Sequence, residues 1–118
     1  MTGTVLIDGT WHTPDRHIEV TDPANGSVVG QVGWGDAADA RRAADAAAAA
    51  FDAWADTPPR ARADLLLRAA ELIGARQQAI GKLLAREAGK RLPEALAEVA
   101  FSAEYFRWFA EQARRPHG

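Results

Sequence analysis

The sequence predicts a mostly helical chain that begins with a small antiparallel β unit. Two observations lead to this prediction. Before residue 35, apolar and polar residues alternate in short runs, as they do in strands with one face in water. From residue 36 onward, apolar residues recur with a period near 3.6, as in amphipathic helices. We therefore expect a β-hairpin unit over 3–35 and helices over 36–115.

Turn residues divide the β unit into strands. Residues 5–7 are followed by Asp8-Gly9, a pair that supplies the left-handed backbone angles of a tight reversal. Two further runs with strand character, 17–21 and 27–32, are separated by a turn that contains Asn25-Gly26. These two runs predict a hairpin.

Capping and breaking residues indicate where the helices begin and end. Asp36 is a suitable N-cap for the first helix, which should end at 57–59 because prolines there disfavour helix in the preceding residue. The next helix follows, and we expect a break near 74–77, where a glycine lowers helix propensity. Gly89 ends that helical run, and a final helix is predicted over 93–115, with proline in its first turn.

Composition indicates an ordinary globular chain and excludes several other classes. Of the 118 residues, 47% are hydrophobic and 25% are charged, which excludes a disordered chain. No apolar run approaches the ~20 residues of a membrane-spanning helix, and the N-terminus does not have the pattern of a signal peptide. Because cysteine is absent, disulfides and thiolate metal sites are excluded. We expect a cytoplasmic chain with no membrane partner.

The charges are unevenly distributed. Residues 1–59 carry three basic and nine acidic side chains, a net charge of −6, whereas residues 60–118 carry eleven and seven, a net charge of +4. A basic half can indicate nucleic-acid binding, which needs uncompensated charge along one track. Here acidic residues alternate with the arginines, as on a solvated helix surface. We therefore expect no nucleic-acid partner.

One motif suggests a cofactor site. The segment 33–38, Gly-Trp-Gly-Asp-Ala-Ala, fits G-x-G-x-x-A, follows a predicted strand and opens a helix, as a dinucleotide fingerprint does. That fingerprint also requires a return to a second, parallel strand. Two prolines and another helix follow here instead. We interpret the motif as a glycine-rich turn before an N-cap and assign no cofactor-binding residue.

No catalytic or metal-binding residue is indicated. His12, His17 and His117 do not have the spacing of metal ligands. No carboxylate lies alone on an apolar face, where burial would raise its pKa for acid–base catalysis. Gly89-Lys90 lacks the first glycine and the final hydroxyl of a phosphate loop. The catalytic and metal assignments are therefore none.

The last predicted helix is apolar on two sides. At 100° per residue one stripe consists of Leu96, Val99, Ala103, Phe106, Ala110 and Ala113. A second stripe, nearly opposite, consists of Phe101, Tyr105 and Trp108, with Phe109 at its margin. A small alanine-rich core offers little to cover such large rings. Either this helix is the centre of a compact bundle, or its aromatic stripe meets a ligand channel or a protein that this chain does not supply.

Several short segments, taken in order, form one longer pattern. They are Ile7-Asp8-Gly9-x-Trp11, the run 22–30, the run 47–54, the run 60–73 and Glu87-x-Gly89-Lys90, followed by 98–100, 106–111 and 114–115. In this order and spacing they resemble the N-terminal quarter of the aldehyde dehydrogenase superfamily. The tail most resembles the succinate-semialdehyde dehydrogenase branch.

This resemblance implies that the chain is the N-terminal portion of an α/β enzyme and belongs to its cofactor-binding half. The family oxidises aldehydes to acids with NAD or NADP: a cysteine thiolate attacks the aldehyde, hydride passes to the nicotinamide, and a glutamate activates water. These groups lie downstream of the matched segment. The chain alone is therefore expected to be inactive and to bind no cofactor. Its partners would be the remainder of the dehydrogenase fold and, in the parent enzyme, further copies in a homo-oligomer.

The resemblance also implies a role for the aromatic stripe. Phe101 matches a position that lines the substrate tunnel of the family, and Tyr105 and Trp108 lie on the same face. Glu87 matches a carboxylate that in some members helps to hold a structural monovalent cation. Arg91 is a departure, because the family usually has proline there. The alternative, from another class, is a non-catalytic helical module that binds a protein through the aromatic stripe.

The sequence ends on a helix stop, Arg115-Pro116-His117-Gly118, directly after this two-sided helix. We therefore expect the reading frame to continue, or once to have continued, into dehydrogenase sequence.

Overall fold

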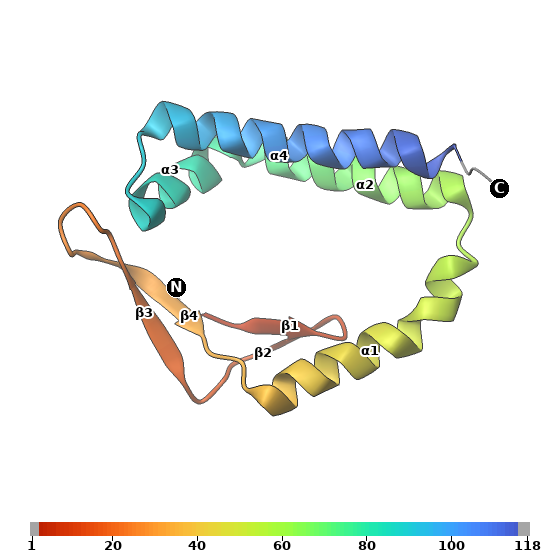
Figure 1. Ribbon diagram of the computed structural model, residues 1–118, viewed down its shortest axis with the longest axis horizontal. Coiled ribbons are helices and arrows are strands. Elements are labelled where there is room, and N and C mark those ends of the chain that lie inside the picture. Colours follow the sequence, from red (N-terminus) through yellow and green to blue (C-terminus); the bar gives the residue numbers. More distant parts are fainter. Residues whose placement is uncertain (1–2, 116–118) are drawn as a thin grey trace. The chain divides into compact units, whose positions relative to one another are not determined.

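The computed structural model describes residues 3–115 and divides into two compact units, Met1–Asp56 and Thr57–Gly118. The first unit contains β1 (Val5–Ile7), β2 (Thr10–His12), β3 (His17–Thr21), β4 (Val28–Gly33) and α1 (Ala37–Ala55) (Figure 1). The second contains α2 (Pro59–Ala75), α3 (Gln77–Ala88) and α4 (Leu92–Ala113). The predicted order of strands followed by helices is confirmed. The predicted helix stop at Pro116, and with it His117, lies outside the described residues.

The strands form two separate two-stranded antiparallel sheets, where one hairpin unit was expected. β1 pairs with β2, which places Leu6 opposite Trp11, and β3 pairs with β4. The reversal at Asp8-Gly9 is confirmed, because these residues have positive φ angles of 51° and 70°. Strand β2 was missed because three residues are too few to display an alternating pattern.

The helix limits follow the capping and breaking residues. The Asp36 carboxylate accepts hydrogen bonds from the N–H groups of Ala38 (2.8 Å) and Asp39 (2.9 Å), and the Asp39 carboxylate accepts one from Asp36 N–H (3.0 Å). This reciprocal capping box confirms Asp36 as the N-cap of α1. The predicted break between α2 and α3 lies at Arg76. Gly89 ends α3 in the left-handed conformation that glycine tolerates best, with φ 64°.

The core of the second unit lies where α2 and α4 pack together. Its buried apolar residues are Ala63 and Ala70 from α2 and Ala95, Val99, Ala103 and Ala110 from α4. Three residues of the first predicted stripe, Val99, Ala103 and Ala110, are therefore buried. Phe106 is an exception and is 36% exposed. Because the contacting side chains are alanine and valine, the helices lie too close together to enclose a phenyl ring between them.

The first unit buries less. Among its described residues, Ile7 is the buried apolar side chain and Asp22 the buried polar one, and α1 has no buried residue. The Asp22 carboxylate accepts a hydrogen bond from Ala24 N–H (2.8 Å), which shapes the turn between β3 and β4. Within residues 3–115, no helix is both long and apolar enough to cross a membrane.

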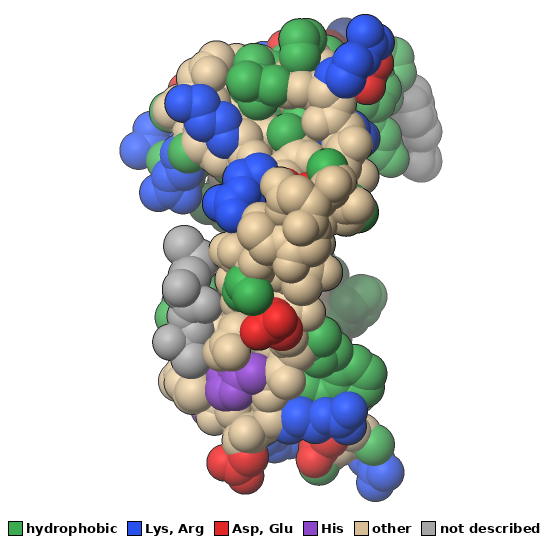
Figure 2. Space-filling model, turned by 90° about the vertical axis from the view of Figure 1, so that its left-hand side faces the viewer, with side chains coloured by type: hydrophobic (Ala, Val, Ile, Leu, Met, Phe, Trp, Pro, Cys, Tyr) green, Lys and Arg blue, Asp and Glu red, His purple; other side chains and the backbone are tan. Residues whose placement is uncertain are grey.

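Some of the basic side chains on the second unit pair with nearby acids. Lys and Arg side chains are prominent over this unit in Figure 2, in line with the net positive charge of residues 60–118. Several of them pair with carboxylates: Arg68 with Glu71 (2.9 Å), Lys90 with Glu98, and Arg91 with Glu94. That the chain binds no nucleic acid stays a prediction, and this pairing is consistent with it.

Candidate functional site

Four aromatic side chains of α4 lie in solvent. The exposed fractions are 71% for Phe101, 58% for Tyr105, 60% for Trp108 and 43% for Phe109. The rings of Tyr105 and Phe109, one helical turn apart, contact each other with centroids 4.7 Å apart and a tilt of 57°. We call these four residues the aromatic face. No described residue of the second unit covers it, so the bundle-centre explanation is wrong for this part of α4.

The aromatic face borders a shallow hollow with charged groups around it. Phe101, Tyr105 and Trp108 form its apolar walls, and Glu104, Arg107 and Glu111 complete the lining. Arg107 forms an ion pair with Glu104 one turn earlier on α4. The structure thus brings together the three residues singled out from the sequence. Such a surface can hold the carbon skeleton of a small molecule, but it offers no nucleophile.

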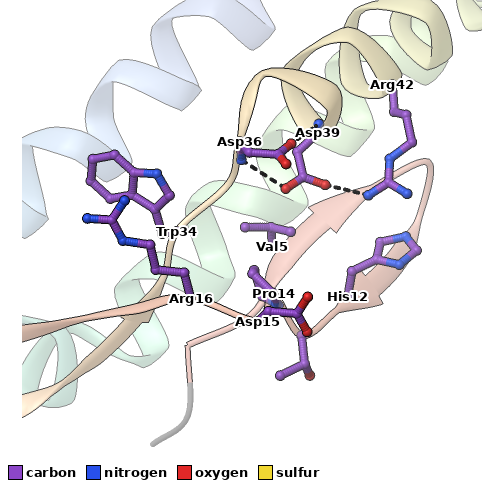
Figure 3. Close-up of a pocket in the computed structure, with 10 residues that line it drawn as sticks. Val5, His12, Pro14, Asp15, Arg16, Trp34, Asp36, Asp39 and Arg42 are labelled. Atoms are coloured by element: carbon purple, nitrogen blue, oxygen red, sulfur yellow. Dashed lines mark hydrogen bonds and ion pairs between the residues drawn. The ribbon is translucent and has the colours of Figure 1, made fainter.

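A second, more polar hollow lies in the first unit near the start of α1 (Figure 3). Trp34 N–H donates a hydrogen bond to the carbonyl oxygen of Arg16 (2.8 Å), and the Arg16 guanidinium lies 4.7 Å from the Trp34 ring centroid in a cation–π contact. On the other side, Arg42 pairs with Asp39. Sequence reasoning missed this hollow because its lining comes from separate segments of the unit. Among its charged side chains, Asp39 and Arg42 pair with each other, and the Asp36 carboxylate is occupied by backbone N–H groups of α1.

Asp39 is the titratable group in this hollow with a perturbed pKa. The hydrogen bond from Asp36 N–H lowers its pKa most, and the hydrogen bond from the Arg42 side chain lowers it further. Both bonds require the carboxylate, so they favour the charged form. This perturbation belongs to the helix cap and does not indicate catalysis.

The N-terminus of α1 does not fit a dinucleotide. The N–H groups of Ala38 and Asp39, which a pyrophosphate would need, already donate to the Asp36 carboxylate. Two carboxylates at this helix end would also repel a phosphate. In addition, β4 pairs antiparallel with β3, whereas the dinucleotide fold requires parallel strands. The G-x-G-x-x-A segment is a turn into a capped helix.

The remaining sequence candidates do not form a site. Within residues 3–115 no group of three His, Asp or Glu side chains is placed to hold a metal ion. His12 lines the polar hollow, and His17 lies in β3 with a buried Nε2 atom that has no hydrogen-bond partner. Glu87 is exposed on α3.

Comparison with known proteins identifies the class of protein. The sequence pattern of the aldehyde dehydrogenase family matches residues 11–118. The chain therefore belongs to the aldehyde dehydrogenase family, as the sequence resemblance predicted.

Individual relatives show which part of the family fold the chain represents. Glutarate-semialdehyde dehydrogenase of Pseudomonas putida is 40% identical over 114 residues, which are 95% of this chain and 24% of that protein. The NADP-dependent succinate-semialdehyde dehydrogenase of Escherichia coli is 36% identical over 115 residues, 96% of this chain and 24% of that protein. The structure of lactaldehyde dehydrogenase from Escherichia coli matches with a TM-score of 0.93 and 38% identity, over 98% of this chain and 25% of that chain. The chain thus spans about a quarter of the length of these relatives and aligns to their N-terminal part.

Proposed function

We propose that this chain forms the N-terminal part of the cofactor-binding half of a cytoplasmic, homo-oligomeric aldehyde dehydrogenase. The whole enzyme would oxidise a small semialdehyde, such as succinate semialdehyde, to its acid with NAD or NADP. In this proposal Phe101, Tyr105 and Trp108 line the tunnel through which the aldehyde approaches the reacting groups.

The observation that carries the tunnel proposal is the exposure of the aromatic face. Three large side chains on one side of α4 are each more than half exposed, although the opposite side of the helix is buried. Exposed aromatic area on this scale marks a surface that contacts a ligand or another part of a protein. The relatives named for glutarate semialdehyde and succinate semialdehyde support a semialdehyde as the substrate class.

The contribution of these residues to the reaction would be contact and exclusion of water. Aromatic rings contact the methylene groups of an aldehyde by dispersion and keep water away from its path. They neither donate nor accept the proton or the hydride. Because the chain has no cysteine, the nucleophile must come from elsewhere in the whole enzyme.

A chimera tests this proposal. The chain would replace the aligned N-terminal part of the Escherichia coli succinate-semialdehyde dehydrogenase. We expect the chimera to form NADPH from succinate semialdehyde. In it, Phe101→Ala should change the ratio of kcat/KM between succinate semialdehyde and a longer aldehyde by roughly tenfold, because it enlarges an apolar wall.

Leu65→Ala in α2 is the matched control, since Leu65 is 58% exposed and lies outside the aromatic face. We expect it to leave the selectivity unchanged. An active chimera in which both substitutions change the selectivity equally would contradict the tunnel role. A folded chimera without activity would contradict the proposal that this chain serves a working dehydrogenase.

A further inference from the structure

One ring of the aromatic face lies outside the hollow but contacts a ring that lines it. Tyr105 is part of the lining and Phe109 is not. The centroids of these two rings are 4.7 Å apart and the rings are tilted by 57°, a separation within the ~4.5–7 Å of favourable aromatic pairs. Phe109 is also the least exposed of the four rings, at 43%. Phe109 therefore meets the hollow through Tyr105.

The order of the side chains around α4 places Tyr105 at one edge of the hollow. At 100° per residue, five side chains are arranged around the helix in the order Glu104, Trp108, Phe101, Tyr105 and Phe109. The first four line the hollow. The charged side chains of the lining thus lie on the flank beyond Trp108, away from Phe109. Tyr105 is the last ring of the wall, and the Phe109 ring supports it from outside the hollow.

An exposed ring at the edge of a wall needs a neighbour to keep one orientation. Tyr105 is 58% exposed, and an aromatic side chain on a helix has two χ1 orientations available, at about 180° and about −60°. Exposed side chains exchange between such orientations rapidly. Because helical side chains lean toward the N-terminus, the Phe109 ring reaches back onto Tyr105, one turn earlier. This contact leaves the Tyr105 ring less room to turn away from the hollow.

We propose that Phe109 is a positioning residue, which holds the Tyr105 ring at the edge of the hollow and thereby sets the width of the hollow there. The inference rests on the tunnel role proposed above for Tyr105. Phe109 itself does not contact the aldehyde. Without its phenyl ring, Tyr105 turns into the vacated space and the hollow becomes wider at this edge. Longer aldehydes then compete better with succinate semialdehyde, because less apolar wall excludes them.

Tyr105 is the one tyrosine in the sequence, so NMR of the chain with isotope-labelled tyrosine observes its ring by itself. Three-bond couplings to the Cβ protons give the χ1 populations of Tyr105. We expect one dominant orientation in the wild type and averaging between two in Phe109→Ala. The matched control Phe51→Ala removes an exposed phenylalanine of α1 and should leave these populations unchanged. Equal χ1 populations in the wild type and in Phe109→Ala would overturn the proposal.

The effect on selectivity is measured in the chimera with the Escherichia coli succinate-semialdehyde dehydrogenase. Phe109→Ala should shift the ratio of kcat/KM between succinate semialdehyde and a longer aldehyde roughly threefold toward the longer one, mainly through KM. Phe109→Tyr retains the ring and should keep the wild-type ratio. In a Tyr105→Ala background, Phe109→Ala should have no further effect on the ratio, because Phe109 acts through Tyr105.

The outcomes separate the positioning role from the tunnel role. If Phe109→Ala lowers the activity toward both aldehydes equally, or shifts the ratio as much in the Tyr105→Ala background, the positioning role is wrong. If Phe101→Ala changes the ratio and Phe109→Ala does not, the positioning role alone is wrong. If neither substitution changes the ratio, the tunnel role is wrong as well. A folded chimera without activity contradicts the proposed function, and the NMR comparison then decides whether Phe109 holds the Tyr105 ring.

Discussion

Gly81 of α3 lies against Leu96 of α4, so closely that a Cβ atom at position 81 would be 2.6 Å from Leu96 Cδ2. Glycine within a helix costs about 1 kcal/mol relative to alanine. Here the cost accompanies a close approach of the α3 backbone to the Leu96 side chain, which would have to move to admit a larger residue at position 81. The Gln77 side chain strengthens the same contact, because its Nε2 donates a hydrogen bond to the carbonyl oxygen of Leu96 (2.9 Å). Leu96 of α4 therefore contacts α3 twice, through its side chain at Gly81 and through its carbonyl oxygen at Gln77.

Gly81→Ala should destabilise the chain although alanine is the better helix former. The added methyl group meets Leu96, and overpacking of this kind costs about 1–3 kcal/mol. Urea unfolding followed by circular dichroism measures the change. Gly74→Ala in α2 is the control: a Cβ there meets nothing within 4 Å, so the same substitution should stabilise by up to about 1 kcal/mol. Equal effects at both sites would contradict the packing argument.

Gln77→Ala should lower the free energy of unfolding by about 0.5–1.5 kcal/mol, the usual net value of one hydrogen bond. The bond from Gln77 to Leu96 joins α3 to α4 and is partly buried, so water replaces it poorly. Gln78→Ala, at the exposed neighbouring position, is the matched control and should change stability little. A loss of stability in Gln78→Ala as large as that in Gln77→Ala would argue against this role of the amide.

The capping box of α1 should make the first unit less stable in acid. The pKa of Asp39 is lower in the folded chain than its ordinary value of 3.8, because Asp36 N–H and then Arg42 donate hydrogen bonds to the carboxylate. A lowered folded-state pKa adds stability above pH 3.8, and this stability is lost as the pH falls through the folded pKa. NMR titration of the Asp39 carboxyl carbon checks the direction.

Asp39→Asn should remove this part of the pH dependence of α1 stability, which amide hydrogen exchange in α1 measures. Asp52→Asn, at an exposed position on the same helix, is the control and should retain it. A titration of Asp39 at or above pH 3.8 would contradict the assignment.

The purified 118-residue chain should not produce NADH or NADPH from succinate semialdehyde. Thiohemiacetal formation requires a thiolate, and the chain contains no cysteine. Absorbance of the reduced nicotinamide measures the product, with the Escherichia coli succinate-semialdehyde dehydrogenase as positive control. Steady production that survives removal of contaminating enzymes would show that the chain catalyses the oxidation by another route.

Features that depend on neighbouring residues could be predicted from the sequence. The Asp8-Gly9 reversal, the Asp36 cap, the break at Arg76 and the glycine stop at Gly89 all follow from the backbone preferences of a few adjacent residues. The aromatic face was predictable for a similar reason. Once α4 is a helix, a rotation of 100° per residue places Phe101, Tyr105 and Trp108 on one side. The family was also predictable, because its short motifs occur in the correct order.

Features that depend on packing between distant segments were decided by the tertiary structure. The strands divide into two sheets, and Ala95 and Gly81 are buried where helices approach closely. Phe106 belongs to the same apolar stripe as the buried Val99 and Ala103, yet it stays partly exposed, and the side chains buried between α2 and α4 are alanines and one valine. The contact of Arg16 with Trp34 likewise joins residues that are distant in the sequence, one directly before β3 and the other directly after β4. Periodicity shows which side of a helix is apolar, but the distance to the opposing backbone determines which of those side chains can be enclosed.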